Sequence, residues 1–311
     1  MAIAAAPKAS PSPETLQVQV ALDRSGFSPG VIDGHSGATL SKALKGFQAA
    51  HDLPQSGQPD GATKAALTDV AGTVDYTLTA KDFAGPFVGP MPSKPADQAK
   101  LPAMGYADAM EQLAERFHTT PDTLRTLNAP GTKLVAGAKI KVPNVLPAAT
   151  AYPESFKPDW RAELALLNVS SDQPKAAKLE VSKSQGVLRV LDADGKLLAQ
   201  FPATMGSTHD PLPIGHWKVQ GTSYLPTYHF NPALFWDAKP GESKETMKGG
   251  PNSPVGVVWM DLDKPHYGIH GTPNPEKIGR TESHGCIRLT NWDAARLSLM
   301  VKPGTPADFV E

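Results

Sequence analysis

Hydrophobic residues near the start of the chain recur at the spacing of helices. A first predicted helix carries Leu16, Val18, Ala21 and Leu22. A second has apolar residues at i, i+4 and i+7, namely Leu40, Leu44 and Phe47, and a short third one has Ala66 and Leu67. An Asp-Gly turn and a threonine that can cap a helix precede each of the last two. Residues 13–72 are therefore predicted to form a small three-helix domain.

The next periodic stretch, residues 104–144, combines helical and extended spacing. One face of a predicted helix carries Met110, Leu113, Ala114 and Phe117. Thr119-Thr120-Pro121 begins a second helix, and residues 137–143 are predicted to form a short closing strand. Proline-rich stretches flank this module at 84–102 and 143–158. They predict extended linkers, because proline lacks an amide donor and disfavours helix at the preceding residue.

From residue 176 onward the pattern changes to that of strands. Residues 186–191 and 196–201 flank the turn sequence Asp192-Ala193-Asp194-Gly195, which predicts a β-hairpin. Further strands are expected at 216–220 and 255–260. The fold class predicted for the whole chain is multidomain α+β, with a mainly-β domain over residues 176–311 whose chemistry lies on loops.

Composition narrows the possible functions. The 311 residues carry a formal net charge of −1, and a nucleic-acid-binding protein needs a basic face, so we expect no nucleic-acid partner. No apolar run reaches the roughly 18–20 residues of a membrane span. Residues 1–7 lack the basic and apolar regions of an intact signal peptide, although they fit the stub of a trimmed one.

The only cysteine, Cys286, lies in a stretch that suits nucleophilic catalysis. His270 precedes it, His284 and Gly285 adjoin it, and Arg288 follows. We expect an imidazole or a cation within reach to shift the thiol toward thiolate. A glycine beside the nucleophile lets the backbone approach a carbonyl and aim amides at an oxyanion. Cysteine acyl transfer needs these groups.

The same residues resemble the L,D-transpeptidase catalytic domain of the YkuD type. Its signature, His-Gly-Thr and then Ser-X-Gly-Cys-X-Arg, is present as His270-Gly271-Thr272 and residues 283–288. Residues 213–217, 291–294 and 304–306 support the resemblance. It implies a catalytic set of Cys286, His270, Ser283, Gly285 and His284, and a substrate-binding set of Arg288, Gly271 and Thr272.

The resemblance also implies a role for each catalytic residue. Cys286 is the nucleophile and His270 the general base, while Ser283 orients His270 through its carbonyl or hydroxyl. The amides of Gly285 and Cys286 form the oxyanion hole, and Arg288 holds a substrate carboxylate. His284 is the less favoured alternative base. A zinc site built from these histidines and the cysteine is a minor alternative, since no familiar ligand spacing organises them.

The two front segments resemble wall-binding modules. Residues 13–72 are similar to the three-helix peptidoglycan-binding domain, through Leu16-Gln17, Gly26-Phe27, Ile32-Asp33-Gly34 and Phe47-Gln48. Residues 104–144 resemble a LysM module through Leu113–Phe117, Leu127-Asn128 and Ile140–Pro143, but the opening strand of that family and its Gly-Asp-Thr-Leu are missing. Peptidoglycan glycan and stem peptides are the expected partners.

These resemblances predict an exported, periplasmic or wall-associated enzyme that uses no cofactor. The thiol would attack the L-to-D amide of a tetrapeptide stem, release D-Ala and pass the acyl group to an amine. An L,D-carboxypeptidase with the same site, a silent wall-binding scaffold and a zinc hydrolase are the alternatives. The aromatic-rich stretch 228–236 is expected either to cover the site or to pack on the sheet.

Overall fold

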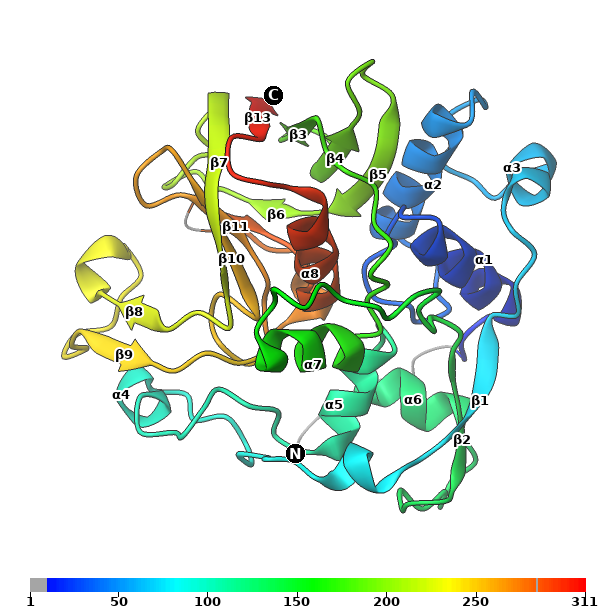
Figure 1. Cartoon of the computed structure of the whole chain (residues 1–311), viewed down its shortest axis with the longest axis horizontal. Coiled ribbons are helices and arrows are strands. Elements are labelled where there is room, and N and C mark those ends of the chain that lie inside the picture. The colour runs from blue at the N-terminus through cyan, green and yellow to red at the C-terminus, as the bar shows by residue number, and fades with distance from the viewer. Residues whose placement is uncertain (1–9, 284) are drawn as a thin grey trace, which may run out of the picture.

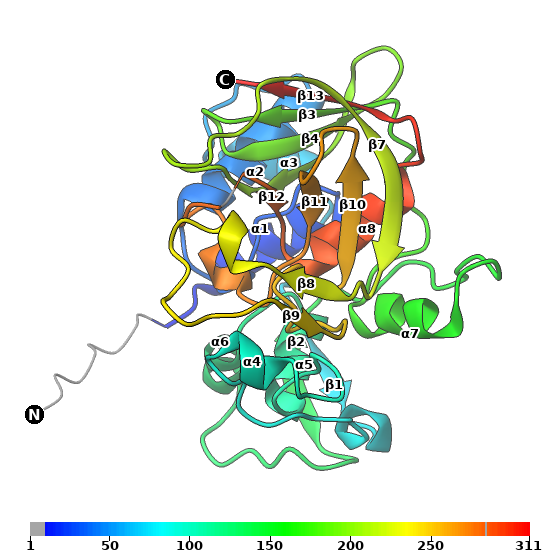
Figure 2. The same cartoon turned by 90° about the vertical axis from the view of Figure 1, so that its left-hand side faces the viewer.

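A nine-stranded sheet forms the centre of the molecule (Figures 1 and 2). The computed structural model describes residues 10–283 and 285–311. The strands lie in the order β5 (Leu197–Pro202), β4 (Val187–Leu191), β3 (Lys178–Ser182), β13 (Pro306–Val310), β7 (Gly215–Tyr224), β10 (Val258–Leu262), β11 (Gly268–His270), β12 (Ile287–Arg288) and β6 (Thr204–Met205). The expectation of a mainly-β C-terminal domain is confirmed.

The hairpin predicted from the Asp-Gly turn is the pair β4–β5. Leu188 lies opposite Phe201, and both side chains are fully buried. The carboxylate of Asp192 accepts hydrogen bonds from the amides of Asp194 and Lys196 at 3.0 and 2.8 Å. Gly195 has φ +79°, the left-handed conformation for which glycine is suited. The strand predicted at 255–260 begins later, because residues before Val258 form a turn.

Helix α8 (Asn291–Met300) has no exposed face, because it is surrounded on all sides. All of its residues are buried, and Trp292 and Leu297 belong to the same core as the sheet. Thr290 caps the helix by accepting from the amide of Asp293 at 3.1 Å. In Figure 1 the helix lies between the sheet and the N-terminal half of the chain, with α7 (Pro158–Leu166) below it in that view.

The three-helix domain consists of α1 (Pro13–Arg24), α2 (Ala38–Ala50) and α3 (Gly61–Ala66), as predicted. It covers the edge of β5. Gln200 accepts from the amide of Ser28 at 2.9 Å and donates its own amide to Gly26 at 3.0 Å. Because an open edge presents unpaired amides and carbonyls, this contact closes the sheet at that end.

The second module is larger than the sequence indicated. Helices α5 (Ala109–Arg116) and α6 (Pro121–Leu127) and strand β2 (Lys139–Pro143) are where the periodicity predicts them. The expectation that an opening strand is missing is wrong, because β1 (Thr73–Thr77) pairs antiparallel with β2. We refer to residues 73–143 as the second module. Its opening strand precedes the proline-rich stretch, so linear spacing did not connect it with the helices.

The remaining elements are short. A 3-10 turn, Ala80–Phe83, comes directly before the first predicted linker, residues 84–102. That linker contains α4 (Pro95–Gln98) and is otherwise irregular. Strands β8 (Tyr228–Phe230) and β9 (Glu245–Met247) form a separate antiparallel pair, joined by a segment with the 3-10 turn Pro232–Leu234. Another 3-10 turn covers Pro275–Lys277. Among the described residues, no helix has the length and apolar character that crossing a bilayer requires.

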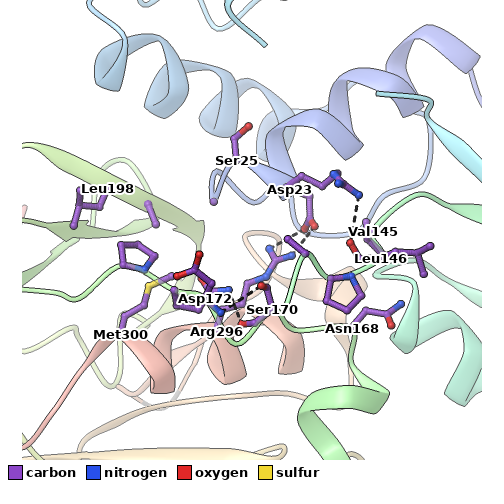
Figure 3. A pocket seen from close by; sticks show the side chains of 17 residues that line it. Asp23, Ser25, Val145, Leu146, Asn168, Ser170, Asp172, Leu198, Arg296 and Met300 are labelled. Atoms are coloured by element: carbon purple, nitrogen blue, oxygen red, sulfur yellow. Dashed lines mark hydrogen bonds and ion pairs between the residues drawn. The ribbon is translucent and has the colours of Figure 1, made fainter. Parts of the chain in front are cut away.

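A buried charged junction joins the parts. Asp23 of α1 accepts two hydrogen bonds from the guanidinium of Arg296 on α8, at 3.0 and 2.6 Å (Figure 3). It also meets Nδ1 of His118 at 3.2 Å, and that ring stacks on Trp292 with centroids 5.0 Å apart. His118 belongs to the second module, so both front modules pack against α8.

Candidate active site

Parallel pairing of β11 with β12 brings the two chemical motifs together. Ile269 lies beside Ile287, and His270 lies beside Arg288. Cys286 directly precedes Ile287, so it comes next to Gly268, whose backbone amide donates a hydrogen bond to the sulfur. The two motifs are separate in the sequence and adjacent in the sheet.

His270 is held as a neutral ring. Its Nδ1 lies 2.7 Å from the carbonyl oxygen of Gly271, and because a carbonyl only accepts, Nδ1 carries the proton. The indole of Trp259 stacks on the ring, with centroids 5.3 Å apart. Burial, and then the nearby charge of Arg288, lower the pKa of His270 to about 3. Nε2 therefore has a free lone pair at neutral pH.

Cys286 does not have the depressed pKa that the sequence led us to expect. Burial raises the pKa of the thiol, and the amide of Gly268 and the charge of Arg288 only partly oppose this. The thiol lies 3.8 Å from the carbonyl oxygen of His266, to which it donates a weak hydrogen bond. The expectation fails because desolvation disfavours the thiolate more than its neighbours favour it. The resting pair is a neutral thiol and a neutral imidazole.

Ser283 shapes the loop that carries the nucleophile. Its hydroxyl donates to the carbonyl oxygen of Cys286 at 2.7 Å and accepts from the amide of Gly206 at 2.7 Å. Its own amide donates to the carbonyl of Gly206 at 3.0 Å. Because the single hydroxyl proton goes to Cys286, this hydroxyl does not donate to His270. Orientation of His270 by the carbonyl of Ser283 stays a prediction.

Glycine is needed at position 285, beside the nucleophile, both for its backbone conformation and for the space available there. Its φ is +95°, in the left-handed region, and a Cβ there would lie 2.7 Å from Cε1 of Tyr267. Tyr267 was not among the residues selected from the sequence, although it directly precedes Gly-Ile-His. Its ring packs on the loop, so only glycine at position 285 allows the loop this close to β11.

Arg288 carries a positive charge that lowers the pKa of the Cys286 thiol. Its buried Nε has no hydrogen-bond partner among residues 10–283 and 285–311. Burial lowers the pKa of Arg288, while Cys286, Tyr228 and Asp237 raise it. Tyr228 comes from β8, and burial raises its pKa to about 12. The aromatic-rich segment therefore starts next to Arg288, which favours its role as a wall of the site.

Of the other predicted site residues, Gly271 and Thr272 contact neighbouring residues of the protein, and His284 is not among the described residues. Gly271 is buried, and a Cβ on it would collide with the side-chain oxygen of Asn291. Thr272 is 7% exposed and accepts from the amide of Asn274 at 3.3 Å. A substrate contact of either residue stays a prediction. His284 lies outside the described residues, and the rest contain no cluster of three or more histidine, cysteine or acidic side chains suited to a metal ion.

Comparison with known proteins adds to this geometry. Residues 176–308 match the YkuD family, described as the L,D-transpeptidase catalytic domain. Residues 11–67 match a family described as "Putative peptidoglycan binding domain". The protein named "Putative L,D-transpeptidase YkuD" from Bacillus licheniformis is 51% identical over 201 residues, which are 64% of this chain and 91% of that protein. The chain belongs to the L,D-transpeptidase family.

More distant relatives of this L,D-transpeptidase have similar names. "Putative L,D-transpeptidase YqjB" from Bacillus subtilis is 30% identical over 131 residues, 40% of this chain and 66% of that protein. The solved catalytic domain of the E. faecium L,D-transpeptidase acylated by ertapenem is 22% identical, covering 44% of this chain and 99% of that one, with a TM-score of 0.34. Together the two matched families make peptidoglycan the partner of this enzyme and imply that it associates with the cell wall.

Proposed function

We propose that this L,D-transpeptidase uses Cys286 as its nucleophile on the L-to-D amide of a tetrapeptide stem. The sulfur forms a bond with the carbonyl carbon while Nε2 of His270 takes the thiol proton. His270 then protonates the leaving amine, D-Ala departs, and a thioester remains on Cys286. The observation that carries this proposal is the β11–β12 register, with His270 protonated on Nδ1 and Nε2 left as an acceptor.

The neutral state of both groups decides how the attack proceeds. Because burial raises the pKa of Cys286 and lowers that of His270, the ground state is not a thiolate–imidazolium pair. Proton transfer to His270 therefore accompanies attack. The amide of Gly268 lies where it stabilises negative charge on sulfur as that charge develops.

Substrate binding and charge stabilisation are assigned to the residues around the thiol. Arg288 offers a buried guanidinium Nε without a partner among the described residues, which suits a stem carboxylate. The backbone amides of Gly285 and Cys286 form the oxyanion hole. The positive φ of Gly285, which only glycine adopts without strain, fits that role.

The acyl group passes to an amine, which gives a 3–3 cross-link or attaches a protein to the wall. Water at the same step would give D-Ala release without a new amide, the L,D-carboxypeptidase alternative. Mass spectrometry of products with and without an added amine acceptor separates the two. Because the second module resembles LysM, we assign glycan binding to it. The enzyme acts in the periplasm or at the wall after export.

Intact-mass spectrometry tests the nucleophile directly. The full chain is incubated with a tetrapeptide stem or with a carbapenem, whose strained lactam reacts by the same acyl transfer. We expect one adduct on the wild type and none on Cys286→Ala, while His270→Gln forms it far more slowly. An adduct of equal yield on Cys286→Ala would overturn the proposal. A wild type that binds sacculi but forms no adduct would favour the scaffold alternative.

A further inference from the structure

Asn291, the first residue of α8, connects three segments through one side-chain amide. Its oxygen accepts from the amide of Val257 at 3.2 Å. Its nitrogen donates to the carbonyl of Pro251 at 3.0 Å and to Oε1 of Glu115 at 2.7 Å. The residue is fully buried, so water does not replace any of these bonds. The position of this amide is set by its partners.

The amide of Asn291 lies against the end of the strand that carries His270. Gly271 packs so closely on its oxygen that no Cβ would fit there. The carbonyl of the same glycine accepts the Nδ1 proton of His270 at 2.7 Å, and its amide donates to Val258 at 3.2 Å. Moving Asn291 would therefore move the group that fixes the tautomer and direction of the His270 ring.

Glu115 is the partner of Asn291 that comes from outside the catalytic domain. It lies on α5 of the second module, 176 positions earlier in the sequence. The groups that act on its ionisation are Asn291, Tyr106, Glu111 and Glu163, and burial, the largest cause, raises the pKa of Glu115 to about 8. At neutral pH its carboxyl is mostly uncharged, so the bond from Asn291 is one between neutral groups.

We propose that Glu115 is a positioning residue for the L,D-transpeptidase reaction, acting through Asn291 and Gly271 on His270. The second module is thereby a structural part of the active site as well as a wall-binding candidate. This inference rests on the proposed role of His270 as general base. It predicts that a change on α5, in another module, alters the acylation step while substrate binding is left nearly unchanged.

The test compares three variants of the full chain. Glu115→Gln keeps an acceptor for Asn291, and Glu115→Met removes it. Gln112→Met alters the same helix at a side chain that donates to the carbonyl of Asp82 in its own module, at 3.4 Å. We expect Glu115→Met to lower the maximal rate of lactam acylation about tenfold, since small misplacements of a catalytic group cost this much or more. The half-saturating lactam concentration should change less than about twofold. Glu115→Gln and Gln112→Met should stay near the wild type.

A second readout follows the His270 ring itself. The Nδ1 proton bonded to Gly271 gives a downfield proton resonance in NMR that should persist in Glu115→Gln and weaken or shift in Glu115→Met. If Glu115→Met does not fold, Glu115→Asp replaces it, because its shorter side chain draws the acceptor away from Asn291. Both readouts should then change in the same direction.

The outcomes separate this inference from the proposed function. If the wild type forms no adduct, or if Cys286→Ala forms one, the proposed function fails first. If the wild type reacts and a folded Glu115→Met keeps its rate and the NMR resonance, the positioning role is wrong. Equal impairment of Glu115→Gln and Glu115→Met also contradicts it. If neither Glu115→Met nor Glu115→Asp folds, Glu115 serves stability alone and the inference is overturned.

Discussion

Asp23 and Glu115 are both buried carboxyls through which a front module contacts α8, yet their surroundings differ. Burial opposes ionisation of Asp23, but Arg296 and His118 more than offset it and hold its pKa well below the usual range. Glu115 meets an amide and other acidic groups, and burial raises its pKa to about 8. The charged junction holds α1 against α8, whereas the neutral junction fixes the side-chain amide of Asn291 at the active site. A buried carboxyl therefore takes its charge state from its partner.

The largest effect is expected from breaking the charged junction. Arg296→Met leaves Asp23 buried without its guanidinium, which should cost about 3–5 kcal/mol of stability. The shift of the unfolding midpoint in urea, followed by circular dichroism, measures this. The double variant Asp23→Leu with Arg296→Met should lose less than the single one. A double variant that is less stable than the single would contradict our description of the junction.

The neutral junction should make stability depend on pH. The folded-state pKa of Glu115 is raised from 4.5 to about 8, so its contribution is fully present below about pH 4.5 and is lost as pH rises toward 8. Glu115→Gln has no ionisable group at this position. Its free energy of unfolding should therefore fall less between pH 5 and 8 than that of the wild type, by on the order of a few kcal/mol. Thermal unfolding at stepped pH checks this. Glu163, with its pKa raised to about 7 by burial, remains as an internal reference slope.

The acid limb of the acylation rate should distinguish the two junctions. With the pKa of His270 lowered to about 3, the wild-type rate should stay flat from about pH 8 to 5 and fall only well below pH 6.5. Glu115→Met loosens the support of the ring, admits water and should move the limb upward toward pH 6.5. An Arg296→Met protein that still folds should keep the wild-type limb. An identical upward shift in both variants would remove the distinction.

The smallest effect is expected at a buried hydrogen bond next to the charged junction. The hydroxyl of Ser28 donates to Asp293 at 2.7 Å, and burial raises the pKa of that carboxyl to about 6. Ser28→Ala should cost about 1–2 kcal/mol, since it leaves a buried acceptor without this donor. Its acylation rate should equal that of the wild type. A slower rate without loss of stability would mean that this junction also acts on the active site.

Local sequence patterns predicted most of the architecture and the chemical motif. Helical spacing predicted the three helices of the first domain, and Asp-Gly turn chemistry predicted the β4–β5 hairpin. The residues around His270 and Cys286 indicated the family before any fold was known. Such signals act between neighbours along the chain, so they are readable from the sequence alone.

Contacts between distant segments were decided only by the tertiary structure. Strand β1 joins the second module across the proline-rich stretch, and Glu115 reaches Asn291 from another module. The pKa of Cys286 is raised rather than lowered, because the number of atoms that bury a thiol depends on the whole packed fold. The sequence determined which groups this enzyme possesses, whereas the tertiary structure determined their protonation states and what holds them in place.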